Sequence, residues 1–441
     1  MAPKATLLLC AALAAVDGWK APPQKLLKPL ATKLLEASLA VTTLGALPAV
    51  AGAAPQATTH QPSRKYLFVT GFPFPLGPIT ERRTVKSELV KGKVYGFVQE
   101  LRLSGITANS RCTVFRTANN DLIVYDPVAP TEEFLEQLAS LNGRVTHILL
   151  GATTYEHKAF VGPFSRKFPS AKVWAVPDQW AWPLDLAPKT LGVDVKRNGG
   201  GDLVDSASVA STYPQDFREE FEVKLLRPAQ RLGLGYAASE AAVFHKPTKT
   251  LALTDALVNV PSKPTQDYEA DNLRGVGADA KTDKSLGQLV LSLLRLTDFE
   301  GGRRIVDEYW SKPTSDDSLQ RGWERNVLLS LFFGPAPQSI VEPHASFAKL
   351  PGAWRVAPVT ETLVYKSDRV RPELQRWVDD VSKWDFTYVS PAHFAAGKGS
   401  PAEWKRAFGP VLSGERDPAY SAGDLRLLET LSAAIQKAGV I

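Results

Sequence analysis

The chain has 441 residues, of which 44% are hydrophobic and 22% charged; this composition excludes a disordered polyelectrolyte and suffices for one large domain or two ordinary ones. The formal net charge is +6, and residues 1–54 carry half of that excess, as five lysines against two acids. The balance left in residues 55–441 is too mild for electrostatic recognition of nucleic acid, and no zinc-finger spacing or basic–aromatic repeat accompanies it.

Two apolar stretches lie near the start of the chain, with a basic, acid-poor spacer between them. Residues 6–16, TLLLCAALAAV, resemble the core of a secretory signal peptide, and Trp19 follows shortly after. The second stretch, residues 37–51, is fifteen residues long and contains Thr, Gly and Pro. It is shorter than the roughly 20 residues that a membrane-spanning helix needs, although a membrane anchor is the alternative interpretation.

This arrangement resembles the compound leaders of algae with complex plastids, in which a signal peptide precedes a transit peptide and a lumen signal. The resemblance implies a targeting leader over residues 1–54 and cleavage near residues 52–54. We therefore expect a plastid protein, located in the thylakoid lumen, with no transmembrane span in the mature chain.

Ordered structure is predicted to begin at residues 93–103, after an irregular segment over residues 55–92 that is rich in Pro, Thr and Arg. Residues 111–130 predict two strands joined by a tight turn at Asn119-Asn120, because Asn tolerates the positive φ that such a turn requires.

A helix followed by a buried strand is predicted next. Residues 131–143 suit a helix with Thr131 at its N-cap and Gly143 at the left-handed position after its last turn. The apolar run at residues 145–151 predicts a buried strand. Further strands are predicted within residues 171–177, 221–226, 241–260 and 385–394.

The chain becomes helical after residue 285. Helices are predicted at residues 286–296, 319–333, 372–384 and 423–437. Strands on both sides of a helical region favour an α/β sandwich, with the helices between 285 and 384 forming one outer layer and a partial lid.

Four polar side chains occupy equivalent places at the ends of predicted strands. Glu156-His157 follows the strand at 145–151, Asp255 ends a later strand, and His393 ends the last one. Loops at strand ends are where such sheets gather functional residues. Two carboxylates and two imidazoles from separate segments would suit Zn, Fe or Mn, so we expect these side chains to converge on one divalent ion. Separate structural roles, in loop hydrogen bonds and turn caps, are the alternative.

The same features resemble a known family. The order of strand, helix, strand, acid–His loop, "TD" strand end and late "PAH" strand is similar to the metallo-β-lactamase fold. The phrases DLIVYDPVAPTEEF, EHKAFVGPFSRKFPSAKVWAVP, FHKPTKTLALTDALVNV and WDFTYVSPAHF look like one uncharacterised branch, domain-of-unknown-function family 4336 of cyanobacteria, algae and plants. This resemblance implies an αββα sandwich over residues 93–441, with a helical insertion at about 262–384 and added C-terminal helices.

The resemblance also implies which metal ligands remain. The superfamily's full loop reads His-x-His-x-Asp-His, and its last pair falls on Glu156 and His157, whereas Ala152 and Thr154 replace the first two histidines. The first metal site of the two-metal enzymes is therefore in doubt. The second site would use Glu156 and His157 together with Asp255 and His393, with a carboxylate displaced by about 1.5 Å because Glu replaces Asp.

Two functions from different classes follow from this pattern. The first is a non-catalytic plastid scaffold or assembly factor that keeps the fold and binds a plastid protein. The second is a single-metal hydrolase of an ester, thioester or phosphoester, in which Glu156 is either a ligand or the general base. The sequence names neither the small-molecule substrate nor the oligomeric state.

Overall fold

The computed structural model describes residues 61–67, 79–103, 106–179, 189, 193–195, 197–206, 213–228, 238–277 and 318–437. The expected leader and the predicted helix at 286–296 lie outside these residues. The chain divides into two compact units, Met1–Pro62 and Ser63–Ile441, and the fold described below belongs to the second. Among the described residues, no helix combines the length and the apolar character needed to cross a membrane.

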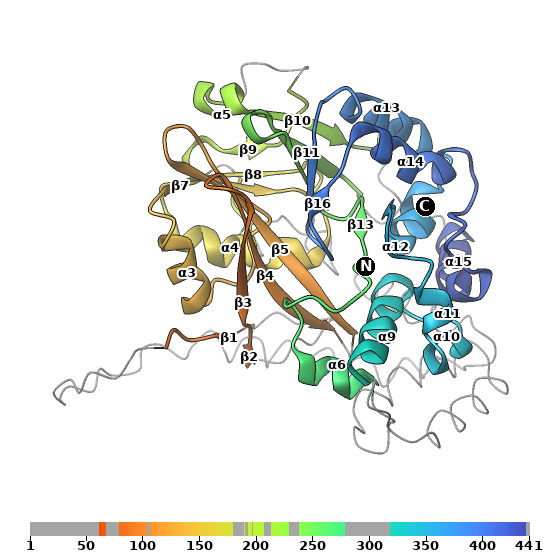
Figure 1. Cartoon of the computed structure of the whole chain (residues 1–441). Helices are drawn as coiled ribbons and strands as arrows, with labels where there is room; N and C mark the ends of the chain where they lie inside the picture. Colours follow the sequence, from red (N-terminus) through yellow and green to blue (C-terminus); the bar gives the residue numbers. More distant parts are fainter. Residues whose placement is uncertain are drawn as a thin grey trace, which may run out of the picture. The chain divides into compact units, whose positions relative to one another are not determined.

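The first sheet has seven strands in the order β3-β4-β5-β6-β7-β8-β9 (Figure 1). The strands are β3 (Thr84–Val90), β4 (Val94–Leu103), β5 (Ile106–Arg116), β6 (Asp121–Tyr125), β7 (Arg144–Leu150), β8 (Lys172–Ala175) and β9 (Gly201–Asp202). Neighbouring strands are antiparallel from β3 to β6 and parallel from β6 to β9.

The second sheet has five strands in the order β10-β11-β12-β15-β16. The strands are β10 (Phe221–Leu226), β11 (Glu240–His245), β12 (Thr250–Leu253), β15 (Tyr388–Pro391) and β16 (Gly397–Lys398). Because β12 and β15 pair in parallel, the segment before Asp255 lies beside the segment before His393. Two small sheets pair β1 (Lys65–Leu67) with β2 (Ile79–Glu81) and β13 (Val258–Asn259) with β14 (Trp354–Arg355).

The helices within the described residues are mostly short. They are α3 (Glu132–Ala139), α4 (Tyr155–Lys167), α5 (Gln215–Glu220), α6 (Ala270–Gly277), α9 (Ser318–Phe332), α10 (Pro337–Val341), α11 (His344–Phe347), α12 (Pro358–Thr360), α13 (Arg371–Val381), α14 (Pro401–Leu412) and α15 (Ala422–Lys437). Single turns are the 3₁₀ segments η4 (Arg197–Gly199) and η5 (Lys246–Thr248) and the π-helix η6 (Glu361–Tyr365).

The two large sheets pack face to face, and helices cover their outer faces (Figure 1). Strand β6 is apolar along its whole length because both of its faces are buried. Ile123 and Tyr125 face the other sheet, while Leu122 and Val124 face the helices. Helices α3 and α4 pack on the first sheet, and α13 and α14 pack on the second. The fold is therefore the predicted αββα sandwich, and residues 63–441 pack as one unit.

Three local predictions need correction. The segment predicted as irregular contains the strands β1, β2 and β3; β3 pairs with β4 as an edge strand, and its exposed side carries polar residues. Glu156 and His157 lie in the first turn of α4 and not in a loop. The left-handed residue after α3 is Asn142, with φ of 52°, and not Gly143.

The predicted N-cap is confirmed, since the Thr131 side chain accepts the Phe134 N–H. The predicted domain boundaries and partial lid stay predictions.

Two other histidines, His147 and His245, are buried outside the group Glu156, His157, Asp255 and His393. The ring of His147 packs against Trp174, and His245 contacts Thr248 and Glu220. Burial lowers the pKa of each ring from the ordinary 6.5 to about 4. The unfolded chain therefore binds more protons than the folded chain between these values. Stability should be full above pH 6.5 and fall towards pH 4, by up to ~1.4 kcal/mol per pH unit for each histidine.

Urea denaturation at pH 7 and pH 5 measures this effect. A His147→Gln variant should lose less stability between the two pH values than the wild type. Equal pH dependence in the wild type and in His147→Gln would contradict the assignment.

Candidate metal centre

The four residues predicted from the sequence come together past the ends of β7 in the first sheet and of β12 and β15 in the second. Glu156 and His157 stand on the first turn of α4, Asp255 follows β12, and His393 follows β15. One possible ligand atom from each lies within 4.8 Å of the others, and this is the single group of three or more such residues among those described. The expected convergence of these side chains is confirmed, and the binding of an ion by them stays a prediction.

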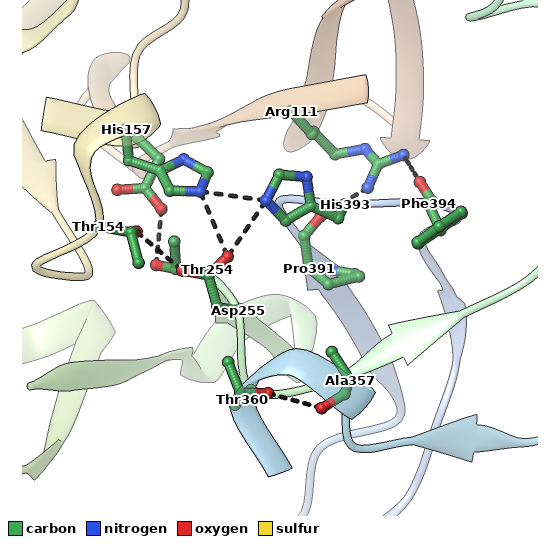
Figure 2. A network of polar contacts seen from close by, with 12 residues as sticks. Arg111, Thr154, His157, Thr254, Asp255, Ala357, Thr360, Pro391, His393 and Phe394 are labelled. Atoms are coloured by element: carbon green, nitrogen blue, oxygen red, sulfur yellow. Dashed lines mark hydrogen bonds and ion pairs between the residues drawn. The ribbon is translucent and has the colours of Figure 1, made fainter. Parts of the chain in front are cut away.

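Three of these residues form a closed triangle of possible ligand atoms (Figure 2). Nε2 of His157 lies 3.2 Å from Nε2 of His393, and Oδ1 of Asp255 lies 3.4 Å from the first and 3.1 Å from the second. For bonds of ~2.0–2.1 Å, two ligands of a tetrahedral ion lie roughly 3.3 Å apart. The triangle therefore has the dimensions of one face of such a coordination shell.

Hydrogen bonding assigns the proton positions on one ring. Nδ1 of His393 lies 2.6 Å from the backbone carbonyl oxygen of Asn109. A carbonyl oxygen only accepts, so Nδ1 carries a hydrogen, and Nε2 is the ring nitrogen left for a metal ion. Nε2 lies 3.1 Å from Oδ1 of Asp255 and 3.2 Å from Nε2 of His157. Such electron-rich atoms repel one another unless a proton or a cation lies between them, so the donor set fits a metal ion.

The charges at the site are strongly coupled. Burial opposes protonation of His157, but the adjacent Asp255 carboxylate outweighs it and raises the pKa of His157 to about 10. Burial likewise opposes ionisation of Asp255, yet His157 and His393 hold the pKa of this carboxyl well below its usual range. In the absence of a cation, a proton shared by these groups takes its place, and metal binding would release that proton.

A buried glutamate that the sequence interpretation missed holds the Asp255 turn. Oε1 of Glu240 accepts the backbone N–H groups of Thr254, Asp255 and Ala256 at 3.0, 3.0 and 2.9 Å. Burial raises the pKa of Glu240 to about 8, and the Asp255 charge adds to the increase. Glu240 begins β11, and nothing in its local sequence distinguishes it from an exposed glutamate.

A second missed carboxylate joins the two sheets beneath the site. Asp126 accepts the Gly151 N–H at 2.8 Å and the Thr254 hydroxyl at 2.7 Å. The Thr254 hydroxyl also lies 2.8 Å from that of Tyr125. A Cβ on Gly151 would lie 1.9 Å from the Tyr125 oxygen, so this position requires glycine. The place of Asp126 directly after β6 was a signal that could have identified it.

The two positions that lack the superfamily's histidines have other uses here. Ala152 is buried and pairs with Glu240 in an isolated β-bridge. The Thr154 hydroxyl donates to Oδ2 of Asp255 at 2.8 Å. Asp255 thus directs one carboxylate oxygen at the histidines, while a threonine hydroxyl satisfies the other. This arrangement suits one ion and not a carboxylate that bridges two.

The two packed sheets and their helical layers form the αββα sandwich that the resemblance to the metallo-β-lactamase fold implies. The model of the family described as "Domain of unknown function (DUF4336)" matches residues 91–351 and 341–409, and the chain belongs to that family. No curated protein matches the sequence.

Several solved structures match the chain with low sequence identity and low TM-scores. The flavodiiron core of Flv1 from Synechocystis has 10% identity and a TM-score of 0.39, over 76% of this chain and 62% of that one. A metallo-β-lactamase from Pontibacter korlensis has 12% identity and a TM-score of 0.29, over 54% and 96%. The mono-zinc form of FIM-1 from Pseudomonas aeruginosa has 7% identity and a TM-score of 0.31, over 81% and 97%. The chain spans less than two thirds of the flavodiiron core.

Proposed function

We propose that the protein binds one divalent metal ion, Zn, Fe or Mn, and acts as a single-metal hydrolase. The observation that carries this proposal is the triangle of His157, His393 and Asp255, in which three possible ligand atoms lie 3.1–3.4 Å apart. Glu156 stands close enough to complete the ligand set or to serve as the general base.

A bound divalent ion would supply an acidified water for attack on an ester, thioester or phosphoester. The chain's own residues would hold and orient that ion. The side chain of His157 is fully buried, whereas 17% of the His393 side chain is exposed. A small-molecule substrate would therefore approach from the side of His393 and Asp255.

A second candidate function is a non-catalytic scaffold or assembly factor that binds a plastid protein. The observation that favours it is the replacement of two ligand positions by Ala152 and Thr154, together with the hydrogen bond from Thr154 to Asp255. On this proposal the cluster is a hydrogen-bonded remnant that stabilises the fold.

Metal analysis of the purified mature chain separates the two candidates. After loading with Zn²⁺, Fe²⁺ or Mn²⁺ and removal of excess ion, we expect at most one ion per chain, because the described residues offer one cluster. A stoichiometry of two would refute the one-ion site. No retained ion with any of the three metals would leave the scaffold as the function, and hydrolysis of model esters by the loaded protein would support the enzyme.

We also propose that the mature protein resides in a plastid, in the thylakoid lumen. The proposal rests on the two apolar cores of residues 1–54 and their acid-poor spacer. N-terminal sequencing of the native protein tests it, and a chain that retains residues 37–51 and needs detergent for extraction would contradict it.

A further inference from the structure

Strand β5 has an edge that the neighbouring strand does not cover. Strand β4 pairs with β5 from Ile106 to Phe115, but β6 pairs only with Thr113–Arg116. The backbone groups of Thr107, Asn109 and Arg111 on that edge therefore need partners from elsewhere.

Other segments supply these partners. The Asn326 side chain on α9 bonds both backbone groups of Thr107, at 3.1 and 2.7 Å. The Asn109 carbonyl accepts Nδ1–H of His393, and the Arg111 N–H donates to the Ala392 carbonyl at 2.7 Å. The turn that carries His393 thus takes the place of a missing strand at this edge.

The side chains of Asn109 and Arg111 on β5 also bind this turn, which comprises residues 391–394. The guanidinium of Arg111 donates to the carbonyl oxygens of Pro391 and Phe394, at 2.6 and 2.5 Å (Figure 2). The Asn109 amide accepts the Phe394 N–H at 2.7 Å and donates to the Phe394 carbonyl at 3.1 Å. All carbonyls of the turn except that of His393 itself are therefore bonded to these two residues.

The turn needs this support because its backbone is strained. Phe394 has φ of 56°, in the left-handed region that an aromatic residue rarely adopts. Arg111 is buried, and its fixed fork of donors reaches both carbonyls at once. A lysine, with a single ammonium group, cannot reproduce both bonds in that geometry.

We infer that Arg111 is a positioning residue for the proposed metal site. It holds residues 391–394 so that Nε2 of His393 lies 3.2 Å from Nε2 of His157. Asn109 assists by fixing which nitrogen of His393 carries the hydrogen. This inference rests on the proposed function, because the geometry that Arg111 maintains matters for binding an ion.

Co²⁺ binding to the full chain tests the inference, with affinity and the ligand-field absorption of the bound ion as the two measurements. Arg111→Lys is expected to weaken Co²⁺ binding by about 10–100-fold, the usual effect of losing a residue that orients a ligand. The absorption spectrum should change because His393 is displaced. Asn109→Ser removes the side-chain bonds to Phe394 and should act in the same direction, and it serves if Arg111→Lys does not fold.

The matched control is Arg325→Lys. Arg325 is also buried and donates to the carbonyl oxygens of Ile340, Val276 and Gly277, so the substitution removes an equivalent buried guanidinium away from the site. It should leave Co²⁺ affinity and the spectrum unchanged. If the Arg111→Lys and Asn109→Ser proteins fold and keep the wild-type Co²⁺ affinity and spectrum, the inference about Arg111 is wrong, while the proposed metal site still stands. A wild-type protein that binds no Co²⁺ would overturn the proposed metal site, and the inference with it.

Discussion

Replacing His157 by alanine is expected to abolish stoichiometric binding of the divalent ion, and Asp255→Ala is expected to do the same. Each residue supplies one of the three closely spaced ligand atoms that would bind the ion. Metal binding at a four-ligand site is worth roughly 10–16 kcal/mol, or about 3 kcal/mol per ligand, so loss of one corresponds to more than about 100-fold in affinity. Equilibrium dialysis with metal analysis of both variants measures this loss.

The control for this experiment is a histidine that lies outside the cluster. His344 is mostly exposed and contacts Glu324, so His344→Ala should keep the wild-type stoichiometry. If the His157→Ala protein retained one tightly bound ion, the ligand assignment would be wrong. The scaffold function would then be the better explanation of the four-residue cluster.

Replacing Glu240 by alanine is expected to give a large loss of stability. The substitution would leave the buried N–H groups of residues 254, 255 and 256 without their acceptor. An unsatisfied buried donor costs roughly 1–3 kcal/mol, so we expect a decrease of at least about 3 kcal/mol in the free energy of unfolding. The turn that carries Asp255 would also loosen, and metal affinity should fall with it.

Glu240→Gln is the matched variant for that measurement. It keeps a side-chain oxygen in place for the three N–H groups. Burial raises the pKa of Glu240 to about 8, and a neutral amide matches the protonated form that this shift favours. We expect this variant to lose less than about 1 kcal/mol in urea denaturation. Equal losses for the alanine and glutamine variants would show that the oxygen does not hold the turn.

Local sequence patterns were sufficient to predict most strands, the turn between β5 and β6 and the N-cap of helix α3. Apolar runs predicted β7 and β8, and the Asn119-Asn120 pair predicted the β5–β6 turn, where Asn120 adopts φ of 63°. Thr131 was recognised as an N-cap because its hydroxyl can accept a backbone N–H that the first helical turn leaves without a partner. Strand β3 was missed because an edge strand with one exposed face carries the polar residues of a loop.

The candidate site was only partly predictable. The acid–histidine pair, the strand-end aspartate and the late histidine carry chemistry that is visible in their residue types. Their position at strand ends gave a reason to expect convergence. Glu240, Asn109 and Arg111 gave no such signal, because buried and exposed polar residues look the same in a sequence.

The sequence by itself determined the two-sheet α/β character, the four residues of the cluster and the absence of histidines at positions 152 and 154. Only the tertiary structure decided which strand ends are neighbours. Strands β12 and β15 pair in parallel although more than a hundred residues separate them, and that pairing brings His393 to Asp255. Periodicity reports which face of a strand is buried, but pairing depends on long-range packing. For the same reason, the uncovered edge of β5 and the turn that fills it appear only in the folded chain.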